Sequence, residues 1–186
     1  EQNIVRKRLG VPEDKPILLF FGFIRSYKGL DILLEALKLL NDEKREVHLL
    51  VAGEFWDNRK TYDNLINRLN LGSFVHIFSQ YIPDDEVWQF FNAADVFVAP
   101  YTGGTQSGAL KAAIGFGLPA VVTDVITDDI VLMFPKMCFV SPANNAELLA
   151  ESIRHALNAP KLDISEISPY FNQSWDYLIE TTSNFA

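Results

Sequence analysis

Short apolar runs of strand length recur along the chain, and they constrain its fold more than any other feature. Each run is continuously apolar instead of alternating with polar residues, which is typical of strands in a sheet that is covered on both faces. We predict strands at Ile17–Phe23, Val47–Ala52, Phe74–Phe78, Asp95–Ala99, Pro119–Thr123 and Cys138–Val140.

The segments between these runs have a helical period. One apolar stripe consists of Leu30, Leu33, Leu34, Leu37 and Leu40, and a second begins at Leu65, Ile66 and Leu69. Acidic residues follow Pro83 as expected for a first helical turn, and Asn144 or Asn145 can cap a helix that runs through Ile153. Strands and helices therefore alternate along the chain.

This alternation predicts an α/β fold with a doubly wound, Rossmann-like parallel sheet of about six strands and helices on both faces. We expect a short helix through Val5 and Leu9, a connector at Ala159–Pro169, and a C-terminal helix from about Gln173 to Thr182. We predict one domain over residues 1–186. In such sheets ligands bind where strands end and helices begin, so the loops at those points are the candidate sites.

Composition narrows the possible partners and the compartment. The chain has 186 residues, is 48% hydrophobic and carries a net charge of −8, which argues against a nucleic-acid partner because such proteins present a basic face. A single cysteine, Cys138, lies in an apolar run, so we expect a buried thiol, no disulfide and a cytoplasmic location. No apolar stretch is long enough to span a bilayer.

The first candidate loop is Gly22–Gly29, directly after the first strand. Gly22 permits close approach of a ligand to the backbone, while Arg25 and Lys28 place two cations beside a helix start. This combination suits a diphosphate, although a βα turn with two solvated basic residues gives the same pattern.

The second candidate loop is Pro100–Gly108, between the fourth strand and the next helix. Its glycines, hydroxyls and free amides can hold a phosphate without a basic residue. It matches neither a P-loop nor a dinucleotide fingerprint. Taken alone, it is equally well read as a ligand loop or as a glycine-rich connector.

Other chemistries have little support in the sequence. The three histidines, His48, His76 and His155, are widely separated along the chain and lack metal-ligand spacing, so we expect no metal site. No Gly-x-Ser-x-Gly motif is present, and Cys138 lies in a predicted strand, which argues against a nucleophilic hydrolase. Acidic residues after the second and fifth strands, such as Glu54 and Asp128, are more often helix caps or solvated groups.

These segments in this order resemble the C-terminal domain of GT-B-fold glycosyltransferases of family 4. The resemblance covers nearly the whole chain. It rests on Phe21–Gly29 with the helix after it, Leu50–Glu54, Tyr81–Val87, Ala94–Pro100, Gly115–Val122 and the end from Phe171 to Asp176.

The resemblance implies a role for each candidate loop. Arg25 and Lys28 would bind the diphosphate of a nucleotide-sugar and stabilise the leaving group, in place of the metal used elsewhere. Gly22, Glu54 and Ile82 would contact the donor, Ile82 in the loop where the nucleotide base rests. Thr105, Gln106, Ser107 and Gly108 would complete the donor site. No cofactor is implied. Phe23 stands where the family's commonest form has an arginine, so Arg25 would be its substitute.

A larger departure concerns the family's paired glutamates, which hold the transferred sugar and the ribose. Their positions fall on Gly104 and Ala112, neither of which can supply a carboxylate. Backbone amides and the side chains of Gln106 or Ser107 would then hold phosphate and sugar. A retaining transfer of front-face type needs no enzyme nucleophile.

We therefore expect a donor-binding domain that works together with an N-terminal domain absent from this chain. The two would transfer a sugar with retention to a glycan or lipid-linked acceptor. We expect this reaction in the cytoplasm or at the cytoplasmic face of a membrane. The isolated domain would bind but not turn over. The alternative is a non-catalytic sugar-nucleotide-binding or interaction module with the same fold. A receiver-like domain is disfavoured because the required aspartate cluster is missing. Sugar, nucleotide, acceptor and oligomeric state stay open.

Overall fold

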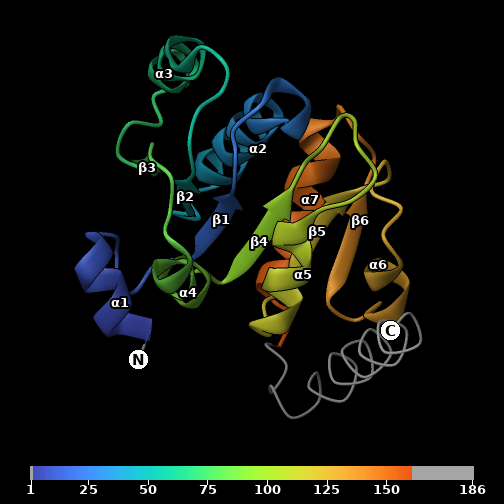
Figure 1. The fold of residues 1–186 in the computed structure, drawn as a ribbon. Helices are drawn as coiled ribbons and strands as arrows, with labels where there is room; N and C mark the ends of the chain where they lie inside the picture. The colour runs from blue at the N-terminus through green and yellow to red at the C-terminus, as the bar shows by residue number, and fades with distance from the viewer. Residues whose placement is uncertain (1, 161–186) are drawn as a thin grey trace.

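A computed structural model describes residues 2–160 of the chain (Figure 1). Its six strands form one parallel sheet. They are β1 (Ile17–Phe21), β2 (His48–Ala52), β3 (Val75–Phe78), β4 (Val96–Ala99), β5 (Ala120–Thr123) and β6 (Cys138–Ser141). The predicted doubly wound α/β fold is confirmed.

The helices connect the strands in the predicted alternation. They are α1 (Gln2–Leu9), α2 (Leu30–Asp42), α3 (Arg59–Arg68), α4 (Asp84–Ala93), α5 (Gly108–Gly115), α6 (Asp129–Met133) and α7 (Ala146–Leu157), with a 3₁₀ turn, η1, at Ser26–Lys28. The predicted helix through Val5 and Leu9 is α1. The predicted C-terminal helix and most of the connector before it lie outside the described residues.

The strand order is β3-β2-β1-β4-β5-β6. From β1 the chain winds toward β3, and from β4 it winds toward β6, so the direction of winding reverses between β1 and β4. The loops that leave these two neighbouring strands begin side by side at the carboxyl edge of the sheet. Ligands of doubly wound proteins bind in the crevice at such a point.

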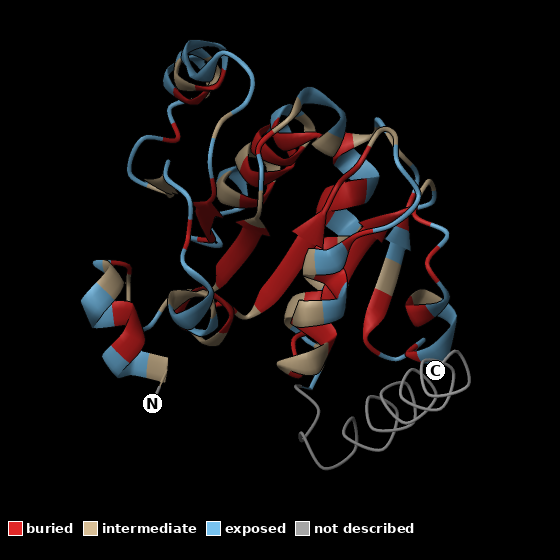
Figure 2. Ribbon diagram, viewed as in Figure 1, coloured by how far each residue is buried: buried red, intermediate tan, exposed pale blue. Residues whose placement is uncertain are grey.

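Two apolar cores, one on each face of the sheet, hold the layers together. Alternate residues of β1 divide between them: Leu19 packs in the core with α4 and α5, whereas Leu18 packs in the core with α2, α3 and α7. Figure 1 shows α5 in front of the sheet and α2 and α7 behind it. Residues of β1, β2, β4 and β5 are almost all buried (Figure 2), as two covered faces require.

Local signals explain the ends of several elements. Asn145, not Asn144, caps α7, since its side chain accepts a hydrogen bond from the backbone amide of Leu148. The first strand ends at Phe21 and not at Phe23 as predicted, because Gly22 adopts a φ of 98° and turns the chain out of the sheet. The third strand is only half-buried, since it lies at an edge.

Candidate functional site

The loops after β1 and β4 meet at the reversal point and are tied together. The amide of Thr102 donates to the carbonyl of Tyr27 at 2.7 Å. At Gly29, which has a φ of 70°, a Cβ atom would lie 2.0 Å from the carbonyl oxygen of Pro100. Only glycine permits this approach, so the two candidate loops of the sequence form one site.

A cavity of about 350 Å³ lies between these loops. Of the predicted site residues, Gly22, Lys28, Gln106, Ser107 and Gly108 line it. The other lining residues are Phe21, Phe23, Tyr27, Val87, Phe91, Tyr101, Ala109 and Ala112. No carboxylate is among these lining residues, so its ionic character comes from Lys28.

Lys28 is held in a partly desolvated position. Its Nζ lies 5.7 Å from the centroid of the Tyr101 ring and 3.1 Å from the point where a Cβ on Gly22 would be. Burial, and then repulsion by Arg25, lower the pKa of Lys28 to about 8. An anion in the cavity would relieve both effects, which makes the ammonium group a strong local attractor for phosphate.

The start of α5 supplies hydrogen-bonding groups on the other side of the cavity. The Ser107 hydroxyl caps α5 by accepting from the amide of Leu110 at 3.2 Å, and it lies 3.1 Å from the Tyr101 hydroxyl. This contact fixes the first turn of α5 beside Lys28. Thr105 does not line the cavity; its carbonyl accepts from the amide of Thr127.

Arg25 does not line the cavity either. Its guanidinium carbon lies 4.0 Å from the centroid of the Trp56 ring, in the loop after β2. Two backbone hydrogen bonds of Ile24, to Glu54 and to Trp56, bind that loop to the loop after β1. The predicted cation pair is therefore split: Lys28 faces the cavity and Arg25 stacks on an exposed tryptophan beside it.

A second cavity, of about 160 Å³, adjoins the first and shares Phe21, Gly22, Phe23 and Val87 with it. The predicted residues Glu54 and Ile82 line it, and Ile82 is buried. The other lining residues are Gly53, Tyr81 and Asp84. A small, mainly apolar pocket with acidic groups suits a planar ring that carries N–H donors.

Of the two positions that correspond to the family's glutamates, one lies in the lining of the first cavity and the other does not. Ala112 lines it. Gly104, with a φ of 80°, packs against the ring of Tyr27. Tyr27 and Tyr101 were not predicted as site residues, and the nearest signal was the position of Tyr27 directly before Lys28.

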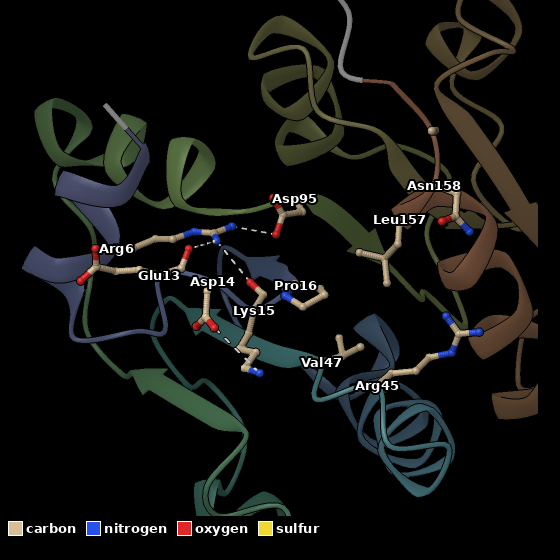
Figure 3. Close-up of a pocket in the computed structure, with 11 residues that line it drawn as sticks. Arg6, Glu13, Asp14, Lys15, Pro16, Arg45, Val47, Asp95, Leu157 and Asn158 are labelled. Carbon is tan, nitrogen blue, oxygen red and sulfur yellow. Dashed lines mark hydrogen bonds and ion pairs between the residues drawn. The ribbon is translucent and has the colours of Figure 1, made fainter.

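A larger cavity, of about 490 Å³, lies at the amino edge of the sheet (Figure 3). Its buried cation, Arg6, donates to the carbonyls of Ala93, Glu13 and Lys15 and forms a 2.7 Å ion pair with Asp95. Arg6 thus anchors α1 and the segment after it to the end of α4. The guanidinium nitrogens of Arg6 are already engaged by these groups, so Arg6 is poorly placed to bind an anion in this cavity.

The cysteine and the histidines are the remaining groups in residues 2–160 that the sequence raised as candidates for chemistry. Burial raises the pKa of the Cys138 thiol to about 12, consistent with the predicted inert cysteine. No cluster of three or more potential metal ligands occurs among these residues. His48 and His76, far apart in the sequence, are brought into contact, with Nδ1 of the first 3.1 Å from Nε2 of the second.

Within residues 2–160 no helix has the length and apolar character needed to cross a bilayer.

Fold and site together define a doubly wound α/β domain with a crevice at its winding reversal. Residues 1–166 match the family described as Glycosyl transferases group 1. The chain belongs to this family, and it corresponds to the C-terminal domain of the GT-B fold.

Similar proteins support this assignment. The lipopolysaccharide glucosyltransferase WaaG of Escherichia coli is 32% identical over 125 residues, which are 67% of this chain and 32% of that protein. YtcC of Bacillus subtilis is 30% identical over 126 residues, which are 66% of this chain and 30% of that protein. The chain therefore spans about a third of the length of these relatives.

Solved structures agree with the fold. The crystal structure of WaaG superposes with a TM-score of 0.73 at 29% identity, covering 88% of this chain and 44% of WaaG. The C-terminal domain of a group 1 glycosyltransferase from Francisella tularensis, LpcC, superposes with a TM-score of 0.65 at 15% identity, covering 83% of this chain and 81% of that domain. Anabaena HepE, solved with UDP, gives a TM-score of 0.73 at 17% identity, covering 95% of this chain and 52% of HepE.

Proposed function

We propose that this chain is the donor-binding domain of a retaining glycosyltransferase, which transfers a sugar from a nucleotide-sugar to a glycan or lipid-linked acceptor. One observation carries the proposal: the cavity at the β1–β4 reversal is lined on one side by Lys28 and on the other by Gln106 and Ser107 at the start of α5. A cation facing a helix start is suited to a diphosphate.

Each part of a nucleotide-sugar has a place in this arrangement. The diphosphate would lie between Lys28 and the amides at the start of α5. The base would enter the smaller cavity beside Ile82, and Glu54 would accept hydrogen bonds from ribose or base. HepE has been solved with UDP and with UDP-glucose, and it shares the fold. This supports a nucleotide-sugar as the ligand of this domain.

The chemical contribution of the domain would be electrostatic. As the bond between sugar and diphosphate breaks, negative charge grows on the leaving phosphate, and the Lys28 ammonium would stabilise it without a metal. Arg25 would add a second positive charge from the edge of the crevice. Retention would follow from delivery of the acceptor on the same face that the diphosphate leaves, a geometry that requires a second domain to hold the acceptor.

Binding is tested by isothermal titration of the 186-residue chain with UDP, UDP-glucose, GDP and GDP-mannose. We expect at least one nucleoside diphosphate and its sugar to bind, and Lys28→Ala to weaken both by about 10- to 100-fold, the range for loss of one charge-assisted hydrogen bond. Absence of binding by all four ligands at millimolar concentration would contradict the proposal.

A second function, a non-catalytic module that binds sugar nucleotides, is favoured by the absence of a carboxylate from the described lining of the first cavity. The two functions differ in turnover. A protein that contains both GT-B domains should release nucleotide from the donor only when an acceptor is present, and Lys28→Ala should suppress this release. Binding without release across a panel of glycan acceptors would favour the module.

A further inference from the structure

Tyr27 occupies a place in the crevice that the proposed function does not yet use. It lies in η1, directly before Lys28, and it lines the first cavity with its side chain 38% exposed. Its ring packs against Gly104 of the loop after β4: a Cβ on Gly104 would lie 3.3 Å from Cε2 and 3.7 Å from Cδ2 of the Tyr27 ring. A side chain at position 104 would therefore begin in tight contact with the Tyr27 ring.

Tyr27 is also held firmly in this position. Its carbonyl accepts hydrogen bonds from both the amide and the hydroxyl of Thr102, at 2.7 and 3.2 Å. Its ring meets that of Tyr101 edge to face, with centroids 5.8 Å apart. A side chain fixed by its backbone and by a packed ring can bind a ligand with little loss of conformational freedom.

The position of Tyr27 relative to Lys28 indicates what it would contact. In a nucleotide-sugar the sugar is bonded to the terminal phosphate, so the neighbours of the phosphate-binding lysine lie within reach of the sugar. A phenol hydroxyl both donates and accepts hydrogen bonds, as sugar hydroxyls do. The aromatic ring offers an apolar surface for the C–H groups of a pyranose.

We propose that Tyr27 is the residue that recognises the transferred sugar, with its hydroxyl hydrogen-bonded to a pyranose hydroxyl. Gly104 and Tyr27 then form a matched pair: glycine makes room, and the phenol supplies the polar contact. This inference rests on the proposed binding of a nucleotide-sugar at Lys28, and it adds the residue that distinguishes the sugar from the bare nucleotide.

The test compares each sugar nucleotide with its own nucleoside diphosphate. The 186-residue chain, Tyr27→Phe and the distant control Tyr62→Phe on α3 are titrated with UDP and UDP-glucose and with GDP and GDP-mannose. We expect Tyr27→Phe to weaken binding of the preferred sugar nucleotide about fivefold, the effect of one neutral hydrogen bond, and to leave its nucleoside diphosphate unchanged. Tyr62→Phe should change neither affinity.

A pair of glycine variants tests the same inference by changing the position of the Tyr27 ring. Gly104→Ala should press on the Tyr27 ring and reduce the affinity ratio of sugar nucleotide to nucleotide, whereas Gly103→Ala, whose Cβ would meet only the Tyr27 Cβ at 3.8 Å, should not. If Tyr27→Phe leaves the ratio unchanged while wild type binds both ligands, the role of Tyr27 is refuted and the proposed function stands. If wild type binds no nucleoside diphosphate, the proposed function itself fails, and this inference with it.

Discussion

The guanidinium of Arg25 stacks on the indole of Trp56, with its carbon atom 4.0 Å from the ring centroid. Trp56 is 55% exposed, and the ring of Phe23 also lies beside it, with the two ring centroids 4.9 Å apart. Arg25 is thus held at the rim of the crevice by a residue of the neighbouring loop. The two cations of the Gly22–Gly29 loop therefore have different roles in the free domain.

This difference predicts unequal effects of the two substitutions. Arg25→Ala should weaken UDP or GDP binding by less than about fivefold, because the guanidinium lies outside the cavity and would act on the nucleotide as an exposed charge, worth up to about 1 kcal/mol. Lys28→Ala should weaken it by about 10- to 100-fold. Titration of both variants with the same nucleotide measures the two effects, and equal losses would show that Arg25 moves onto the diphosphate.

Nucleotide affinity should depend on pH through Lys28. Its pKa is lowered to about 8, so the free domain loses the ammonium charge as the pH rises through 8. A bound diphosphate favours the charged form, and affinity should therefore be highest below pH 8 and fall by up to about tenfold per pH unit above it.

Titrations between pH 7 and 9.5 measure this slope. Lys28→Arg keeps its charge throughout this range and serves as the control, because an arginine is not deprotonated in proteins. An equally steep decline in Lys28→Arg would assign the pH dependence to another group.

The contact between the two loops should be essential to stability. Gly29→Ala should lower the free energy of unfolding by at least about 3 kcal/mol, because its Cβ would lie 2.0 Å from the Pro100 carbonyl oxygen in addition to the strain of a positive φ. Gly10→Ala is the matched control: its φ of 66° is close to the 70° of Gly29, yet nothing lies within 4 Å of the new Cβ. It should cost about 1 kcal/mol. Urea unfolding followed by circular dichroism distinguishes the two.

The fold and the residues of the site differ in how far the sequence predicts them. Continuous apolar runs and helical stripes predict the layers, and the rule for strand ends brings Lys28 and Ser107 into one cavity. The sequence does not predict the direction in which a side chain points. Arg25 turns away because Trp56, in a different loop, stacks on it, and Tyr27 enters the crevice because Gly104 leaves room. Such contacts depend on how loops from separate strands pack, which local patterns do not encode.

His48 and His76 illustrate the same point, since their contact follows from strand register. The β2–β3 ladder pairs Leu50 with His76, which brings the ring of His48 beside that of His76 with centroids 5.3 Å apart. Burial lowers the pKa of both rings, and repulsion by His76 further lowers the pKa of His48. Among the surrounding groups, Glu46 and Asp14 raise the pKa of His48 and Lys15 lowers it.

The pair should therefore make the domain sensitive to acid. Because both folded-state pKa values lie below the value of 6.5 for an exposed histidine, the unfolded chain binds more protons, and stability is complete above pH 6.5 and falls as the pH drops below it. We expect the free energy of unfolding to fall below pH 6.5 until the lowered folded-state pKa values are reached, by at most about 1.4 kcal/mol per pH unit for each ring. Urea unfolding across this range should show a smaller slope for His48→Gln/His76→Gln. Identical slopes in wild type and the double variant would mean that carboxylates, and not these rings, control the acid stability of the domain.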